Sequence, residues 1–326
     1  MRPSVLRPLL RTDMSIELHV SRLLHRHPFL RILLSPALGL GRRWLAYKRQ
    51  ERALVHARLV ELMAEDPVLR LAEFQGNFSL DVRSDLFVRY ILDGTYESGL
   101  VLLLKTFLNP NRDVIDIGAN VGFYSVLCGK LIGPSQTVLA VEPTQNALAR
   151  LRNNIERNGL NNKVIVHEGA ASRHDGVTNL HFIEGKEEYS SLGVLCHPSV
   201  LKTPAQTIVI QCSKLDTIVA AHALDPGFIK VDVEGAEHSV FEGMVQVLSQ
   251  YRPIVMSEFS LPLLKENGSS ADAIVRFFKD LDYVVLDPFV PTLQPGIRAF
   301  GDILCLPCEM ATPGVIQNLQ ALGKTR

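Results

Sequence analysis

The sequence predicts an α/β fold, built on a mainly parallel seven-stranded sheet with helices on both faces. Three observations lead to this prediction. From residue 113 onward, short apolar runs alternate with amphipathic helical patterns, an order typical of parallel sheets. A glycine-containing turn separates the first of these runs from the first of these helices. The composition, with 47% hydrophobic and 21% charged residues, is that of a globular chain with a full core.

The first 65 residues are expected to form a basic helical extension. Residues 1–50 contain ten Lys or Arg and two acidic residues, Asp13 and Glu17, so this segment is strongly basic. The net charge of the whole chain is zero. A basic segment can bind nucleic acid or an anionic membrane surface, and it can equally be a solvated helix face packed on an acidic body. We favour the solvated face over a peripheral membrane contact through residues 1–50, and we expect no nucleic-acid partner.

The sequence predicts neither a membrane span nor a disulfide framework. The most apolar early stretch, Phe29–Leu40, is short and is interrupted by Arg31 and Pro36. Five cysteines are an odd number and too few for a disulfide scaffold, which suits a reducing compartment. We therefore expect a cytoplasmic protein.

Residues 66–112 are expected to lead into the core. Leu69–Phe74 and Phe78–Val82 flank the turn residues Gln75-Gly76-Asn77, a pattern that predicts a hairpin. Two short helices should follow, over residues 85–92 and 95–107.

Residues 113–308 are expected to form the main α/β domain, followed by a C-terminal tail over residues 309–326. The seven expected strands are Asp113–Ile117, Thr137–Val141, Lys163–His167, Phe228–Val231, Ile254–Ser257, Tyr283–Leu286 and Asp302–Leu306. The expected helices are Phe123–Leu131, Gln145–Asn158, Ser239–Ser249 and Ser270–Leu281. Thr178–Phe182 and Thr207–Gln211 predict a further hairpin.

A nucleoside-containing cofactor is expected at the end of the first core strand. In doubly wound sheets, ligands bind beyond the carboxyl ends of the strands. At that place Gly118 and Gly122 let the backbone turn tightly and approach a ligand closely. The next helix offers free N–H groups at its N-terminus. The second strand ends in Glu142, a carboxylate that can accept both hydroxyls of a ribose.

The glycine turn favours S-adenosylmethionine over NAD. A dinucleotide fold uses G-x-G-x-x-G around a pyrophosphate, whereas the run Gly118-Ala119-Asn120-Val121-Gly122 lacks the middle glycine. Asp116 places a carboxylate before the turn, where it would repel a pyrophosphate but can accept from the ammonium of a methionine. An NAD-linked oxidoreductase is the alternative enzyme.

Acidic residues at the ends of later strands are the candidate catalytic groups. Asp232 and Glu234 follow one strand, and Glu258 ends the next. Carboxylates at one sheet edge can bind a substrate hydroxyl, act as a general base or hold a divalent metal. We take Asp232 and Glu234, then Glu258, as the expected bases. We expect no metal ligand, with a magnesium-assisted version left open.

Two neighbours of these acids receive simpler interpretations. Glu237 is taken to favour the N-terminus of the next helix, because a negative charge is stabilised there. His238 is a further candidate base, but a histidine at a helix start is more often solvated.

Taken together, these motifs resemble the FkbM family of class I methyltransferases over about residues 80–306. The resemblance is carried by Asp116–Ser125, Val141-Glu142-Pro143, Lys230–Glu237, Gly94–Glu97, Ser190-Ser191 and Leu215-Asp216. It implies a Rossmann-like seven-stranded sheet whose last strand is antiparallel. It also implies S-adenosyl-L-methionine as cofactor and methyl transfer to a hydroxyl of a sugar, glycan or secondary metabolite.

The resemblance also implies roles for single positions. The residues expected to line the methionine end of the cofactor are Asp116, Gly118, Asn120 and Gly122. Glu142 should hold the ribose, Ala170 and Ala171 should lie near the adenine, and Glu97 should approach from the preceding helix.

The expected acceptor is a small molecule or a glycan. We expect its contacts to come from variable segments near residues 15–80, 184–206 and 287–300, which carry no recognisable motif. A non-catalytic partner or membrane-docking protein that keeps this fold is the third interpretation, after the methyltransferase and the oxidoreductase.

Overall fold

The computed structural model describes residues 51–63, 65–183, 189–193, 204–289 and 300–322. The basic segment 1–50 and much of the two later segments expected to contact the acceptor lie outside these described residues.

The chain forms two compact units. The first comprises Met1–Pro67 and Asp81–Tyr96, and the second Val68–Leu80 and Glu97–Arg326. In the first unit, residues 51–62 are helical and α4 covers Asp85–Asp93. Helix α4 begins where the Ser84 hydroxyl accepts a hydrogen bond from the Leu86 N–H, and it ends at Gly94 in the left-handed conformation. These caps explain why the helix expected over residues 85–92 forms.

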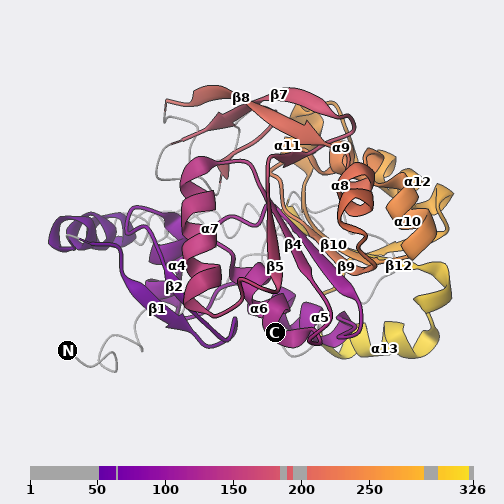
Figure 1. The fold of residues 1–326 in the computed structure, drawn as a ribbon, viewed down its shortest axis with the longest axis horizontal. Coiled ribbons are helices and arrows are strands. Elements are labelled where there is room, and N and C mark those ends of the chain that lie inside the picture. The colour runs from indigo at the N-terminus through magenta and orange to yellow at the C-terminus, as the bar shows by residue number, and fades with distance from the viewer. Residues whose placement is uncertain (1–50, 64, 184–188, 194–203, 290–299, 323–326) are drawn as a thin grey trace, which may run out of the picture. The chain divides into compact units, whose positions relative to one another are not determined.

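Within the described part of the second unit, seven strands form one sheet in the order β11-β12-β10-β9-β3-β4-β5 (Figure 1). The strands are β3 (Asp113–Ile117), β4 (Val138–Glu142), β5 (Val164–Glu168), β9 (Pro226–Val231), β10 (Ile254–Ser260), β11 (Tyr283–Leu286) and β12 (Phe300–Pro307). Strand β12 is antiparallel to both of its neighbours, whereas the pairs from β10 to β5 are parallel. The predicted fold class, including the antiparallel last strand, is confirmed.

The centre of the sheet positions the site. Strand β3 lies between β4 and β9, so the chain order reverses there. Helix α6 (Phe123–Leu131) connects β3 to β4, and α7 (Gln145–Arg157) connects β4 to β5. At such a switch point the carboxyl ends of the strands diverge and leave room for a ligand.

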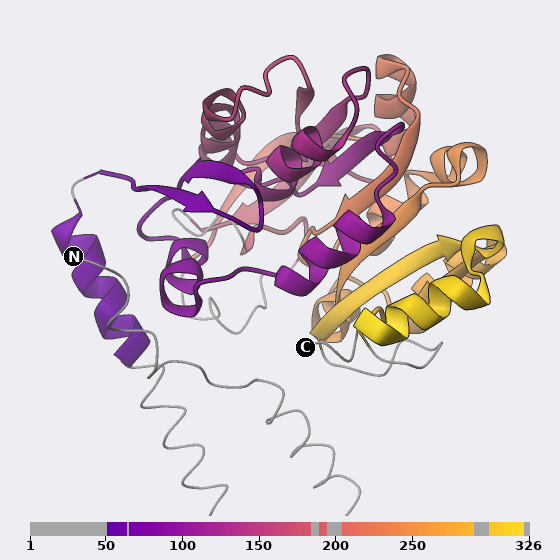
Figure 2. The ribbon, with the colours of Figure 1, turned by 90° about the horizontal axis from the view of Figure 1, so that it is seen from below.

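The two faces of the sheet pack against different helices. One apolar cluster joins alternate strand residues such as Ile115, Ile229 and Val255 to α8 (Leu215–His222), α10 (Val245–Tyr251) and α12 (Ala271–Asp280) (Figure 1). Helices α5 (Ser98–Phe107) and α6 contribute nothing to that cluster and lie on the opposite face (Figure 2). Because strand side chains alternate between faces, Asp116 and Lys230 point toward the α5 and α6 side.

Two hairpins accompany the main sheet in the second unit. Strands β1 (Val68–Leu71) and β2 (Gly76–Ser79) pair antiparallel, so the first hairpin forms, but its turn comes earlier than predicted because Gly76 and Asn77 already belong to β2. Strands β7 (Gly176–Phe182) and β8 (Gln206–Ser213) pair antiparallel, and β8 also pairs with the short β6 (Ala170–Ala171). Both predicted hairpins are confirmed.

The helix predicted over Ser239–Ser249 is wrong as a single element. It is two helices, α9 (Glu237–Glu242) and α10, and they are separated at Gly243 and Met244. Met244 has a φ of −129°, outside the helical region, and this interrupts the helix. A Cβ at Gly243 would lie 2.0 Å from the Ser172 carbonyl oxygen, so glycine is required beside the interruption.

Besides the short strand β6, four short elements of the described residues were not predicted. They are α8, α11 (Leu261–Glu266), the 3₁₀ helix η3 (Cys308–Met310) and α13 (Pro313–Leu322), the last of which occupies most of the expected tail. Across the described residues, no helix combines the length and the hydropathy that a membrane span requires.

Candidate functional site

The glycine turn after β3 adopts a conformation that suits glycine. Gly118 and Gly122 have φ angles of 76° and 90°, and Asn120 between them has 48°. A Cβ at Gly118 would lie 1.8 Å from the carbonyl oxygen of Asp232, so a larger residue cannot be accommodated there. The turn is therefore pressed against the end of β9, where the candidate bases begin.

Glu142 holds this turn from the end of β4. Its Oε2 accepts a hydrogen bond from the Asn120 N–H at 2.9 Å, and its Oε1 accepts from the N–H and hydroxyl of Thr144 at 2.9 and 2.6 Å. Burial raises the pKa of Glu142, and these hydrogen bonds oppose the shift. A carboxylate has about four acceptor positions, so three bonds leave room for one more donor at Oε2.

Asp116 is buried beneath the same turn. Its Oδ2 accepts a hydrogen bond from the Ser125 hydroxyl at 2.6 Å. Its Oδ1 is buried with no hydrogen-bond partner among the described residues, and the Lys230 ammonium lies 3.9 Å away. Burial raises the pKa of Asp116, while the Lys230 charge opposes that shift. Such a carboxylate has unused capacity for a cationic or N–H donor.

Lys230 lies between Asp116 and the candidate base Asp232. It is paired with Asp116 across the β3–β9 register, and its ammonium donates to Asp232 Oδ2 at 3.0 Å. It also lies 4.8 Å from the ring centre of Tyr124, whose hydroxyl donates to Glu97 Oε2 at 2.9 Å. The carboxylates of Asp232, Asp116 and Glu97 together raise the pKa of Lys230 against the effect of burial.

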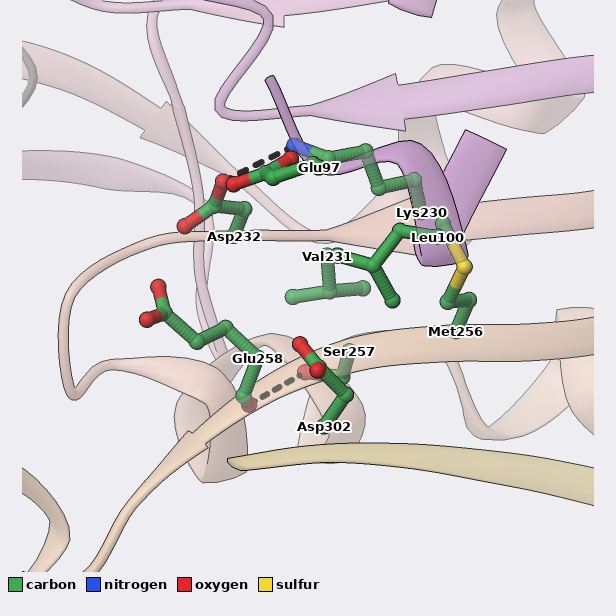
Figure 3. Close-up of a pocket in the computed structure, with 9 residues that line it drawn as sticks. All are labelled: Glu97, Leu100, Lys230, Val231, Asp232, Met256, Ser257, Glu258 and Asp302. Atoms are coloured by element: carbon green, nitrogen blue, oxygen red, sulfur yellow. Dashed lines mark hydrogen bonds and ion pairs between the residues drawn. The ribbon is translucent and has the colours of Figure 1, made fainter. Parts of the chain in front are cut away.

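Carboxyl groups line a pocket at the ends of β9 and β10 (Figure 3). Its lining residues are Glu97, Leu100, Lys230, Val231, Asp232, Met256, Ser257, Glu258 and Asp302. Glu258 and Asp302 are direct partners in the β10–β12 register, which places two carboxyls side by side. Burial, the charges of Asp232 and Glu234, and a hydrogen bond with Asp232 raise the pKa of Glu258 well above its usual value. Glu258 therefore holds a proton more readily than an ordinary glutamate does.

The turn after β9 carries the remaining candidates. Glu234 and Gly235 both have positive φ angles, 50° and 99°, and the Glu234 charge acts on Glu258 although Glu234 does not line the pocket. Glu237 is the first residue of α9, as its simple interpretation requires. It is nevertheless 3% exposed, its Oε1 accepts from the Gly235 N–H at 2.9 Å, and burial raises its pKa to about 7.

The remaining residues predicted from the sequence are Ala170, Ala171 and His238, and their surroundings differ. Ala170 and Ala171 form β6, directly after β5, and both are buried. His238 Nδ1 lies 2.7 Å from the Ser269 hydroxyl, so this ring is not simply solvated.

Sequence reasoning missed Lys230, Tyr124 and Asp302 as members of the site. The period-2 alternation of strands could have found Lys230, because it lies two residues before Asp232 on the same strand face. Tyr124 and Asp302 depend on contacts between distant segments and had no local signal.

A model of the methyltransferase FkbM domain matches residues 116–285, more than half of the 326 residues. The probable cobalt-precorrin-6B C(15)-methyltransferase (decarboxylating) of Sulfurisphaera tokodaii is 30% identical over 125 residues. That match covers 37% of this chain and 64% of the relative, less than two thirds of its length.

Two solved structures also resemble the chain. Methyltransferase FkbM from Methylobacillus flagellatus is 17% identical with a TM-score of 0.42, and the match covers 67% of this chain and 52% of that one. An O-methyltransferase from Bacillus cereus, in complex with SAH, is 16% identical with a TM-score of 0.37, and the match covers 79% and 89%. On the strength of the family model, the chain belongs to the FkbM methyltransferase domain family, and its cofactor is S-adenosylmethionine.

Proposed function

We propose that this protein methylates a hydroxyl oxygen of a neutral, polyhydroxylated small molecule or glycan. The observation that carries the proposal is the pocket in which Asp232 and Glu258 face each other beside the glycine turn. Carboxyl groups accept hydrogen bonds from hydroxyls and repel phosphates and carboxylates, so the lining favours an uncharged acceptor rich in hydroxyls.

The residues around the turn fit S-adenosylmethionine. The buried Asp116 Oδ1 can accept from the methionine ammonium, and Glu142 Oε2 has capacity for a ribose hydroxyl. In this proposal Gly118, Asn120 and Gly122 form the wall of the methionine end. Ala170 and Ala171 lie at the adenine, and Glu97 approaches the rim from the start of α5. When bound, the cofactor supplies a methyl group on a positively charged sulfur.

The protein's own groups then position the acceptor and take its proton. Asp232 is the proposed general base. The Lys230 ammonium, 3.0 Å from its Oδ2, favours the ionised carboxylate, which is the form that can take a proton. Glu258 stays protonated beside it and donates to Asp232, and Glu234 contributes charge from the adjoining turn. Holding the two reactants in line is expected to supply much of the rate.

We further propose residues 113–308 as the catalytic domain, with residues 1–65, 66–112 and 309–326 as accompanying segments. A cytoplasmic location fits the four cysteines of the described residues, which are all free.

The test is methyl transfer from labelled S-adenosylmethionine to a panel of acceptors. The panel contains neutral glycosides and polyols, aminosugars, sugar phosphates and uronic acids. We expect label on hydroxyls of the neutral members and little on the anionic ones. Label on amines or phosphates alone, or thermal stabilisation by NAD but not by S-adenosylhomocysteine, would contradict the proposal.

A further inference from the structure

The turn that carries Glu234 has a backbone conformation that needs external support. Glu234 has a φ of 50° and Gly235 one of 99°, and the first of these is unfavourable for a residue with a side chain. Nonglycine residues keep this conformation where surrounding contacts fix it. The contacts around this turn therefore decide where the Glu234 carboxylate lies.

Ser191 supplies the most direct of these contacts. Its hydroxyl donates to the Glu234 carbonyl oxygen at 2.8 Å and accepts from the Gly193 N–H at 3.1 Å. The side chain is 2% exposed, so both partners would lose a buried hydrogen bond without it.

Ser191 is itself held in place by the hairpin. Its N–H and carbonyl both bond to His181 of β7, each at 2.9 Å, which forms an antiparallel bridge. The segment around Ser191 thus joins the β7–β8 hairpin to the turn after β9.

The side chain of Asn267 packs between the segment around Ser191 and the turn after β9. A Cβ at Gly193 would lie 1.3 Å from Asn267 Oδ1, and a Cβ at Gly235 would lie 2.5 Å from Asn267 Nδ2. The amide therefore fills the space between the two glycines, and its Nδ2 donates to the Leu263 carbonyl at 2.8 Å. Three separate segments therefore meet at the Glu234 turn, and neither glycine has room for a side chain.

We propose that Ser191 is a positioning residue that fixes the backbone of Glu234 and so sets where its carboxylate lies relative to Glu258. The inference rests on the proposed function, because it gives Glu234 a part in the reaction. Ser191 acts through the carbonyl of Glu234 and is not among the residues that line the pocket.

The test is a double-mutant cycle between Ser191→Ala and Glu234→Gln. The measured quantities are the release of S-adenosylhomocysteine with a responding neutral acceptor and the affinity for S-adenosylhomocysteine by calorimetry. We expect Ser191→Ala to lower kcat about tenfold, the size of a lost buried hydrogen bond, with cofactor affinity unchanged within about twofold. In the Glu234→Gln background the same substitution should change kcat by less than about twofold.

Ser249→Ala is the matched control, because that hydroxyl also donates to a backbone carbonyl, Val245 at 2.8 Å, on the exposed side of α10. It should leave kcat unchanged. An equal loss of kcat from Ser191→Ala in both backgrounds would overturn the proposal, since the effect would then not pass through Glu234.

Amide hydrogen exchange separates this inference from the proposed function, because it needs no acceptor. With S-adenosylhomocysteine bound, Ser191→Ala should speed exchange of residues 232–237 and leave β3 and β4 unchanged. Unchanged exchange in the turn would refute the support by Ser191. Faster exchange in a protein that methylates no hydroxyl would instead refute the proposed function alone.

Discussion

The two halves of the rim treat their carboxylates differently. On the β3–β4 side, Asp116 and Glu142 are buried, and each accepts hydrogen bonds, Asp116 from Ser125 of α6 and Glu142 from the glycine turn and Thr144. On the β9–β10 side, Asp232 and Glu258 face each other across a pocket, with Asp302 beside them. In the first half, burial raises the pKa of each carboxyl and its hydrogen bonds oppose that rise. In the second half, burial and the neighbouring carboxylates together raise the pKa of Glu258 well above its usual value. This difference is what a fixed cofactor and a reacting acceptor require.

The largest effect is expected on the β9–β10 side, which carries Asp232 and Glu258 and is called the reacting half below. Asp232→Asn should lower kcat about 100-fold or more, because a general base contributes about 10²–10⁴ to the rate. Its affinity for S-adenosylhomocysteine should change far less, as measured by calorimetry. If kcat stays at the parent value, Asp232 is not the base and the contrast between the halves disappears.

Gly118→Ala tests the β3–β4 side, which carries Asp116 and Glu142 and is called the rigid half below. Its Cβ would meet the Asp232 carbonyl, so we expect a loss of about 3 kcal/mol or more in the free energy of unfolding, measured in urea. Gly159→Ala is the matched control: Gly159 also has a positive φ, 69°, but no atom lies within 4 Å of its added Cβ. It should cost about 1 kcal/mol. Equal losses for the two would mean that the close approach at Gly118 is unimportant.

Glu142→Gln tests whether the remaining hydrogen-bond acceptor position of Glu142 binds the cofactor. The amide keeps the shape of the side chain but loses the charge that strengthens its hydrogen bonds. We expect affinity for S-adenosylhomocysteine to fall about tenfold, the range of a charged hydrogen bond, with kcat at saturating cofactor nearly kept. A kcat loss larger than the affinity loss would move Glu142 to the reacting half.

The last prediction concerns the pH dependence of stability and Glu237, which lies between the halves. Because burial raises its folded pKa to about 7, above the unfolded value, the folded state binds the extra proton. Stability should therefore be greatest below the unfolded pKa and decline as pH rises through about 7. We expect urea unfolding to show a loss of about 1–3 kcal/mol between pH 5 and 8 that Glu237→Gln abolishes. Glu266→Gln, at an exposed carboxyl, should leave the pH dependence intact.

The structure of the rigid half could be predicted from the sequence more completely than that of the reacting half. The strands and the glycine turn follow from local patterns, and β3, α6 and β11 have the predicted bounds. The reacting half also depends on partners that are more than 40 residues apart. Glu258 and Asp302 meet through an antiparallel pairing, and Ser191 meets Glu234 across 43 residues. Periodicity carries no information about such meetings, so the acids could be named but not their arrangement.

The position of β12 has a consequence for synthesis on the ribosome. This last strand lies between β10 and β11 and also contributes Asp302 to the pocket. A nascent chain can assemble the cofactor half from β3, β4 and β9 well before residue 300 is made. Strand β11 must wait for β12 before it can join the sheet. The reacting half is therefore finished last, and a chain still under translation can hold its cofactor before it has a complete pocket for an acceptor.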